Sequence, residues 1–199
     1  MSDEAYIERA IELARRGSGL VSPNPMVGSV VVSDGAIVGE GFHEGPGLPH
    51  AEIMALNHAG ERARGATLYT SLEPCDHYGR TPPCTEAIVR AGIARVVSAT
   101  RDPNPVVDGQ GIRTLRARGV EVREGILADE ADRLNEAFAK HVRTGMPFVI
   151  WKCDVSSSEM ECRASPSNER ICAPGNVSRI GECVATMNCD LPAVTAIDI

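Results

Sequence analysis

Four residues able to bind a metal ion or carry a proton stand near the ends of predicted helices and strands: His50, Glu52, Cys75 and Cys84. One imidazole and two thiolates are ligands soft enough for Zn²⁺, and three protein ligands leave the fourth tetrahedral position for water. Because Glu52 follows His50 by two residues, its carboxylate suits that water as a general acid and base better than it suits the metal. The set predicts one zinc ion per chain, bound by His50, Cys75 and Cys84, with Glu52 as the catalytic residue.

Each part of this set has a plainer explanation when it stands alone. An H-x-E triplet is short enough to arise by chance, and a lone histidine or two separated cysteines are often ordinary core residues. The other five of the seven cysteines lie after residue 150, at irregular intervals and without a C-x-x-C pair. The odd count and the absence of a secretory-type start argue against a disulfide framework, and the spacing argues against a second metal site.

An H-x-E motif followed by P-C and a second cysteine is the signature of zinc-dependent nucleobase deaminases. Their usual P-C-x-x-C is replaced here by a spacing of eight residues, within SLEPCDHYGRTPPC at 71–84. Together with PNPMVG at 23–28, GEGFHEGPGLPHAE at 39–52 and RDPNPVVDGQG at 101–111, this stretch closely resembles the deaminase part of the bifunctional deaminase/reductase of riboflavin biosynthesis. The resemblance covers about residues 1–150.

The resemblance implies a hydrolytic deamination at C2 of 2,5-diamino-6-(5-phosphoribosylamino)pyrimidin-4(3H)-one. The products are ammonia and 5-amino-6-(5-phosphoribosylamino)uracil. It also implies a set of substrate-binding residues, with Arg80 as the cation for the phosphate. The PNP and DPNP stretches are also good turn sequences, in which Asn and Asp bond their own backbone. The predicted substrate-binding residues are Asn24, His43, His77, Arg80, Asp102 and Asn104.

Alternating helical and strand patterns surround these residues. Apolar spacing predicts helices at 2–17, 50–59, 85–91, 111–118 and 129–144, and strands at 27–32, 36–41, 66–71, 95–99 and 120–124. Asp34-Gly35 predicts a tight turn that pairs the first two strands as a hairpin. Strand–helix alternation after a hairpin predicts an α/β fold: a three-layer α/β/α sandwich with a mixed central sheet. The resemblance implies that this sandwich is cytidine deaminase-like.

The composition argues against two classes of partner, nucleic acids and membranes. The 199 residues carry a formal net charge of −7, which disfavours a protein held on nucleic acid by phosphate attraction. No apolar run approaches the roughly 18 residues of a membrane span, so we expect a cytoplasmic protein. The partner that the resemblance implies is a small phosphorylated pyrimidine. Gly109-Gln110-Gly111 imitates a dinucleotide fingerprint, but Thr114 stands at the third glycine position. A homo-oligomer stays open.

The pattern changes after about residue 151. Residues 152–199 contain no aromatic residue and a single leucine, which predicts a poorly ordered tail; the alternative is a small irregular subdomain. PFVIWK at 147–152 resembles the first strand of the family's reductase domain, but the match then decays. We therefore predict a deaminase domain at 1–146 and, at 147–199, a truncated or degenerate reductase remnant with neither an NADPH site nor reductase activity.

Two other functions fit parts of the sequence. One is a deaminase for a different small pyrimidine or purine, for which a phosphate-binding Arg80 would have no purpose. The other is a non-catalytic zinc protein that keeps the fold for assembly. Glu52 argues against the second function, because a structural zinc site uses a fourth protein ligand and needs no free carboxylate beside the metal.

Overall fold

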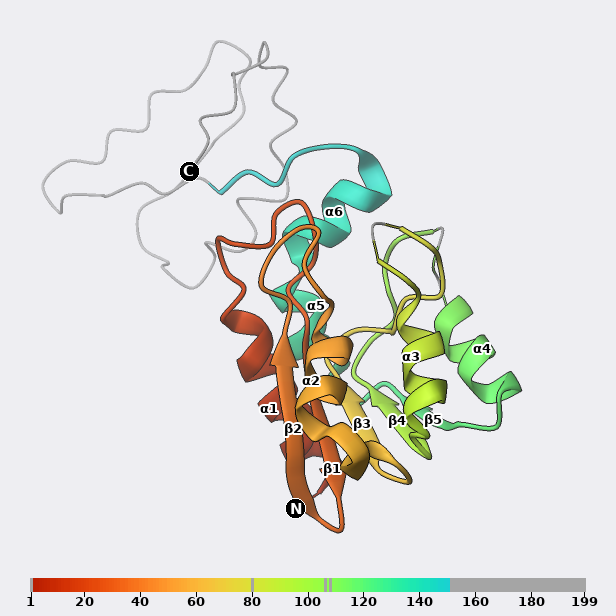
Figure 1. Ribbon diagram of the computed structural model, residues 1–199. Helices are drawn as coiled ribbons and strands as arrows, with labels where there is room; N and C mark the ends of the chain where they lie inside the picture. The colour runs from red at the N-terminus through yellow and green to blue at the C-terminus, as the bar shows by residue number, and fades with distance from the viewer. Residues whose placement is uncertain (1, 80, 106, 108, 151–199) are drawn as a thin grey trace, which may run out of the picture. The chain divides into compact units, whose positions relative to one another are not determined.

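The computed structural model describes residues 2–79, 81–105, 107 and 109–150, and its main compact unit spans Met1–Phe148. At the centre of that unit is a five-stranded sheet in the order β2-β1-β3-β4-β5 (Figure 1). The strands are β1 (Gly28–Ser33), β2 (Ala36–Phe42), β3 (Thr67–Thr70), β4 (Arg95–Ser98) and β5 (Glu121–Glu124). β1 pairs antiparallel with β2 and β3, whereas β3, β4 and β5 run parallel. The sheet is mixed, as predicted.

Helices cover both faces of this sheet. They are α1 (Asp3–Arg15), α2 (Ala51–Ala59), the 3-10 turn η1 (Gly60–Ala63), α3 (Cys84–Ala91), α4 (Gln110–Ala117), α5 (Ala128–Leu134) and α6 (Glu136–Thr144). Successive side chains of a strand point to opposite faces, so the strands feed two separate cores. Val31, Leu68 and Val96 pack with α2, α3 and α4. Val30, Tyr69 and Val97 pack with α1 and α5 on the other face. The predicted three-layer fold is confirmed.

Helix α2 lies unusually close to the hairpin, and this fixes where its first residues point. A Cβ atom at Gly41 would lie 2.6 Å from the carbonyl oxygen of Ala51, and one at Gly39 would lie 2.2 Å from that of Ala55. Only glycine allows the backbone of β2 to approach α2 so closely. The GEG sequence at 39–41 therefore sets the position of α2 and, with it, of His50 immediately before the helix.

One prediction about the helices was wrong. The sequence pattern gave a single helix at 129–144, but the helix breaks at Asn135, which separates α5 from α6. The Asn135 side chain accepts a hydrogen bond from the Met26 N–H at 2.8 Å and donates one to the Met26 carbonyl at 2.9 Å. Asparagine side chains that bond to backbone compete with helical geometry. The helix is therefore interrupted at Asn135, and the same residue fastens α5 and α6 to the loop before β1 through two hydrogen bonds.

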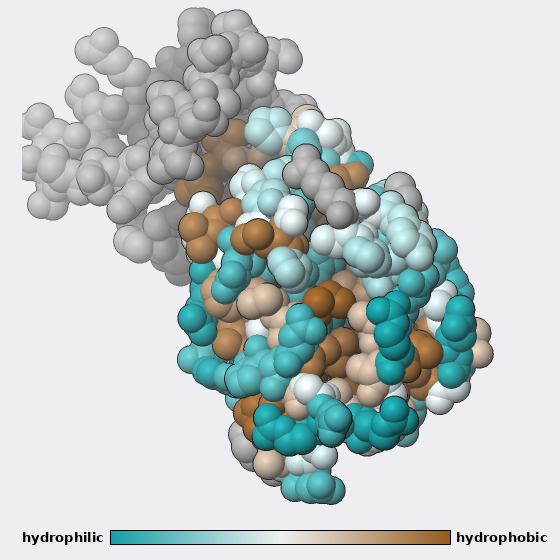
Figure 2. Space-filling model, viewed as in Figure 1, coloured by the Kyte–Doolittle hydropathy of each residue, from teal (hydrophilic) through white to brown (hydrophobic). Residues whose placement is uncertain are grey.

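The surface seen in Figure 2 is mostly hydrophilic, with smaller apolar areas, as expected where helices bury one face and expose the other. In the part of the chain that the structure describes, no helix is both long and apolar enough to cross a bilayer. The predictions for residues 152–199 lie outside the described residues.

Candidate active site

The three predicted metal ligands come from three different elements and converge. His50 directly precedes α2, Cys75 follows β3 through a short extended segment, and Cys84 is the first residue of α3. Their ligand atoms all lie within 4.8 Å of one another. His50 Nδ1 lies 3.5 Å from Cys75 Sγ and 3.3 Å from Cys84 Sγ. A set of one nitrogen and two sulfur donors at this spacing fits a tetrahedral zinc ion with one position left open.

The second ring nitrogen of His50 faces away from the two sulfurs. His50 Nε2 lies 3.4 Å from the hydroxyl oxygen of Thr81, which belongs to the segment between the two cysteines. A partner on the other ring nitrogen fixes the orientation of a metal-binding histidine. The backbone N–H of Cys84 also points at Cys75 Sγ, at 3.4 Å. The segment between the cysteines therefore holds both His50 and Cys75 in place.

The pKa values of the ionisable side chains at this end of the site differ from those of ordinary surface groups. Hydrogen bonds that the Cys75 sulfur accepts from the Cys84 side chain and from His50 lower the pKa of Cys75. Glu52 is 3% exposed, and burial raises its pKa to about 7. The Glu52 carboxyl group and the Cys84 side chain each influence the other's pKa, which places Glu52 beside the ligand set. Perturbed acids in a cleft are typical of catalytic sites.

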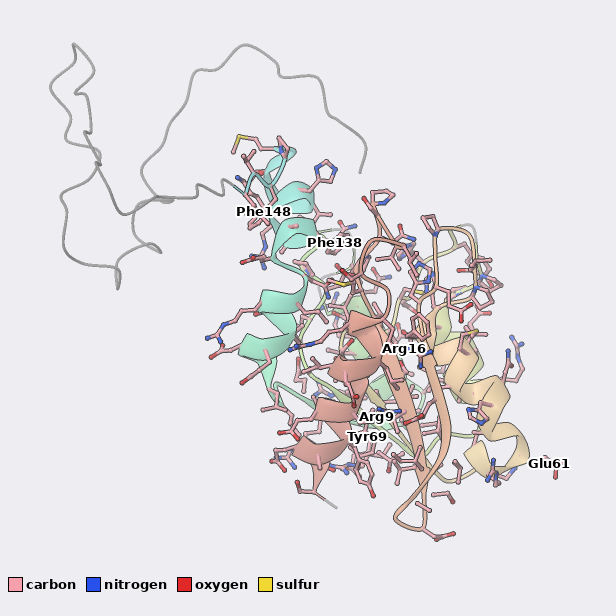
Figure 3. The ribbon with its side chains drawn as sticks, turned by 90° about the vertical axis from the view of Figure 1, so that its left-hand side faces the viewer. Arg9, Arg16, Glu61, Tyr69, Phe138 and Phe148 are labelled. Carbon is pink, nitrogen blue, oxygen red and sulfur yellow. The ribbon has the colours of Figure 1, made fainter. Side chains whose placement is uncertain are left out.

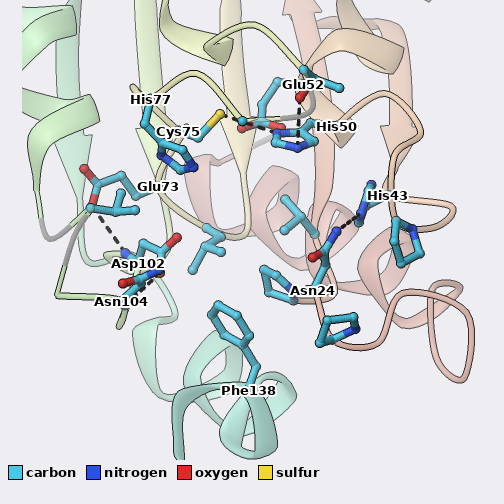
Figure 4. Close-up of a pocket in the computed structure, with 18 of the residues that line it drawn as sticks. Asn24, His43, His50, Glu52, Glu73, Cys75, His77, Asp102, Asn104 and Phe138 are labelled. Atoms are coloured by element: carbon cyan, nitrogen blue, oxygen red, sulfur yellow. Dashed lines mark hydrogen bonds between the residues drawn. The ribbon is translucent and has the colours of Figure 1, made fainter. Parts of the chain in front are cut away.

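His50, Glu52 and Cys75 form one end of a cavity of about 380 Å³ (Figure 4). The cavity is within the usual range for small-molecule sites, which is roughly 300–1,000 Å³. Figure 4 shows the histidine, cysteine and glutamate at one end and polar loop residues at the other, with the Phe138 ring between two of the loops. The residues predicted from the sequence that line it are Asn24, His43, His50, Glu52, Cys75, His77, Asp102 and Asn104.

Asn24 and His43 form one wall. His43 Nδ1 lies 3.3 Å from the carbonyl oxygen of Pro49, which can only accept, so Nδ1 carries the proton. His43 Nε2 is then the acceptor for the Asn24 amide nitrogen at 3.0 Å. Burial lowers the pKa of His43, which favours this neutral form. The arrangement orients the Asn24 side chain by its nitrogen, and the ring of His43 in turn meets the His50 ring edge-on at 5.5 Å.

Asp102 and Asn104 form the opposite wall. The Asp102 carboxylate accepts a hydrogen bond from the Asn104 N–H at 2.8 Å, so the turn expected of DPNP is present, and both side chains line the cavity as well. Burial is the main cause that raises the pKa of Asp102. His77 lines the same cavity but is largely exposed. The predicted phosphate-binding residue Arg80 lies outside the described residues.

Sequence reasoning missed three residues of this site. Phe138 lines the cavity from α6, Glu73 lines it beside Cys75, and Asn135 ties α6 to the loop that carries Asn24. Asn135 is 109 residues from its partner Met26, and Phe138 stands in none of the motifs that carry the other site residues, so no local motif announces either of them. Glu73 does stand within a recognised motif, SLEPC at 71–75, but a glutamate at that position suits several roles, so the motif alone does not assign one.

Comparison with known proteins agrees with this geometry. Residues 1–100 match the family model described as "Cytidine and deoxycytidylate deaminase zinc-binding region". The chain is also 49% identical over 147 residues to the diaminohydroxyphosphoribosylamino-pyrimidine deaminase of Buchnera aphidicola subsp. Schizaphis graminum. The matched region covers 74% of this chain and all of that protein. The chain belongs to this deaminase family. The resemblance stated from the sequence motifs is confirmed.

Larger relatives contain the same deaminase region. Over 174 residues the chain is 49% identical to the riboflavin biosynthesis protein RibD of Escherichia coli. This match covers 87% of this chain and 47% of that protein. The crystal form 1 of RibD from Acinetobacter baumannii superposes with a TM-score of 0.72 at 53% identity, over 73% of this chain and 41% of that one. This member of the deaminase family thus spans less than half the length of the RibD proteins it matches.

Proposed function

We propose that this chain catalyses the zinc-dependent hydrolytic deamination of 2,5-diamino-6-(5-phosphoribosylamino)pyrimidin-4(3H)-one in riboflavin biosynthesis. The observation that carries the proposal is the buried Glu52 carboxyl group beside a His/Cys/Cys set, in a cavity that amide and carboxylate side chains also line. The 49% identity to a full-length relative named as this deaminase supports the choice of substrate.

His50, Cys75 and Cys84 would hold the zinc ion, since they offer the donor types and spacing that the metal requires. Zinc in such a site supplies Lewis acidity, which lowers the pKa of water and makes it a nucleophile near neutral pH. No fourth protein ligand is needed, because a catalytic zinc site leaves that position for water. Glu52 lies beside the three ligands, where it can exchange protons with that water.

Glu52 moves the protons of the reaction. Water adds to the ring carbon that carries the 2-amino group, and Glu52 takes one proton from the water and delivers it to the adjacent ring nitrogen. Glu52 then carries the second proton to the amino group, the C–N bond breaks, and ammonia leaves as the ring carbonyl forms. Burial suits this task, because it keeps solvent from competing for either proton.

The two loop walls would orient the pyrimidine. Its edges present amino, carbonyl and ring N–H groups, which match an amide oxygen at Asn24 and the carboxylate and amide of Asp102 and Asn104. Phe138 offers an apolar surface for the ring between these walls. Arg80 is our proposed partner for the 5′-phosphate. We further propose that residues 1–146 suffice for the activity, with 147–199 contributing nothing to the chemistry.

A substrate panel tests the function. Purified zinc-loaded protein is given the diaminopyrimidine ribosyl phosphate, its dephosphorylated form and dCMP, and ammonia release is followed. We expect the phosphorylated diaminopyrimidine to be the best substrate. Arg80→Ala should lower kcat/KM for that compound by roughly 10–100-fold and change the dephosphorylated form much less. Preference for dCMP, or no ammonia from any of the three, would overturn the proposal.

A further inference from the structure

Glu73 is a buried carboxylate that neither the metal set nor the substrate-binding residues account for. It is 3% exposed and stands between β3 and Cys75, two residues before that predicted ligand. A buried charged group is costly unless it is hydrogen-bonded. The partners of Glu73 that the structure describes are backbone N–H groups of Asp102, Gly109 and Ile112, on the side of the cavity that Asp102 and Asn104 form.

Three such hydrogen bonds are present. Glu73 Oε2 accepts from the N–H of Asp102 at 3.2 Å and from that of Gly109 at 2.9 Å, and Oε1 accepts from the N–H of Ile112 at 3.2 Å. The donors are 29, 36 and 39 residues away in sequence. One carboxylate thus bonds both to Asp102, a few residues after β4, and to the first turn of α4.

Two of these donors belong to the start of α4. Gly109 is the N-cap residue and has no side chain to satisfy the first N–H groups of the helix, so Glu73 takes that task from another part of the chain. A negative charge at this position also interacts favourably with the helix dipole. Close packing reinforces the tie, because a Cβ atom at Gly111 would lie 1.9 Å from the carbonyl oxygen of Pro74.

The third donor, Asp102, belongs to the wall that it forms with Asn104, which we call the recognition wall. Asp102 donates its N–H to Glu73 while its own carboxylate accepts from Asn104, so one chain of contacts runs from Glu73 through Asp102 to Asn104. Figure 4 shows the dashed contact between Glu73 and Asp102 on the side of the cavity near His77. The segment that supplies Cys75 is therefore bonded directly to the wall that faces the substrate.

We propose that Glu73 is a positioning residue: through Asp102 and the start of α4 it holds the wall formed by Asp102 and Asn104 at a fixed distance from the predicted metal ligand Cys75. The proposal rests on the deaminase function argued above and adds a residue to it. Glu73 sets where the pyrimidine is held relative to the reacting end of the cavity. Its replacement should therefore impair substrate binding more than it impairs the metal site.

Glu73→Gln is the sharpest variant, because it keeps the shape of the side chain and turns one acceptor oxygen into a donor that faces N–H groups. Glu61→Gln is the matched control: it makes the same chemical change at an exposed position that Figure 3 shows well away from Phe138. We expect Glu73→Gln to raise KM for the phosphorylated diaminopyrimidine roughly 10–100-fold, with a smaller fall in kcat. Zinc content should stay at one per chain, and Glu73→Asp should give an intermediate KM.

Amide hydrogen exchange supplies a readout that needs no substrate. Glu73→Gln should lose protection at Asp102, Gly109 and Ile112 but not in α2. In a double-mutant cycle, the effect of Glu73→Gln on KM should be non-additive with Asn104→Ala on the same wall and additive with Asn24→Ala on the opposite wall. If Glu73→Gln does not fold, Glu73→Asp carries the same exchange and cycle measurements.

The outcomes separate the two claims. A wild type that releases no ammonia would overturn the proposed function and the role of Glu73 in it. In an active enzyme, a KM for Glu73→Gln equal to that of Glu61→Gln would overturn the positioning role, even if the melting temperature falls, because the residue would then only stabilise the fold. Loss of zinc together with loss of substrate binding would also overturn it.

Discussion

The two ends of the cavity are built in different ways. At the metal end, His50 immediately precedes α2, Cys84 is the first residue of α3, and Cys75 lies a few residues beyond β3, so sheet and helix packing place them. At the recognition end, Asn24, Asp102 and Asn104 lie in loops. Those loops are held by single buried side chains, Asn135 and Glu73, which reach them from elsewhere in the chain.

The difference indicates a division of labour. The metal end has to keep three ligand atoms and one carboxyl group in place within a few ångströms, and rigid elements suit that demand. The recognition end selects a substrate, and loops on a rigid scaffold commonly carry that task. Changes at the metal end should therefore abolish turnover, whereas changes at the recognition end should mainly weaken substrate binding.

The largest effect is expected from removal of a ligand. Cys75→Ala should lose zinc and reduce deamination to background, because two remaining ligands hold the metal poorly. Elemental analysis of the wild type and the variant, together with an ammonia assay, checks this. Equal zinc in both samples would remove Cys75 from the metal site.

Next in size is the loss of the proton carrier. Glu52→Gln should keep both zinc and fold, because the amide has the same shape, while kcat falls by about 10²–10⁴-fold or more. Zinc content and circular dichroism serve as controls. Near-wild-type turnover would show that Glu52 takes no part in the reaction.

A smaller effect is expected at the recognition end. Asn24→Ala removes the amide that His43 orients, and we expect KM to rise roughly tenfold with kcat changed less. Steady-state kinetics of the two values measure the split. A fall in kcat alone would contradict the division between the two ends.

The smallest effect lies outside the cavity, where Asp3 bonds to Arg95 with two oxygens and also accepts from Tyr69. The hydrogen bond from Arg95 is the main cause that lowers the pKa of Asp3 to about 2. A lowered pKa stabilises the fold above the unfolded value of about 3.9 and loses that contribution as the pH falls toward the folded value.

Asp3→Asn should therefore reduce the free energy of unfolding by about 1–2 kcal/mol at pH 7, and the difference should shrink as the pH falls from about 4 to 2. Urea denaturation at several pH values measures it, with Glu8→Gln on the exposed face of the same helix as a control. Kinetic constants at pH 7 should not change. A difference that does not vary with pH would contradict the assigned ion pair.

What could be predicted follows the same division. The metal set could be predicted although His50 lies 25 residues from Cys75 and 34 from Cys84, because each ligand stands in a short motif whose residue types announce metal chemistry. The helices at His50 and Cys84 followed from periodicity, and the mixed sheet followed from the hairpin and the later alternation. The recognition wall depends on contacts between residues 29 to 109 positions apart. No local pattern encodes the reach of Asn135 to Met26, and the same contact explains why one predicted helix is two.

The central claim is that one zinc ion, held at the metal end of this cavity, supports deamination of the phosphorylated diaminopyrimidine. Its most direct test is a titration of the metal-free protein with zinc, with ammonia release measured at each addition. We predict that the rate rises linearly and reaches a plateau at one zinc per chain. Full ammonia release without zinc, or a plateau far from one equivalent, would contradict the account.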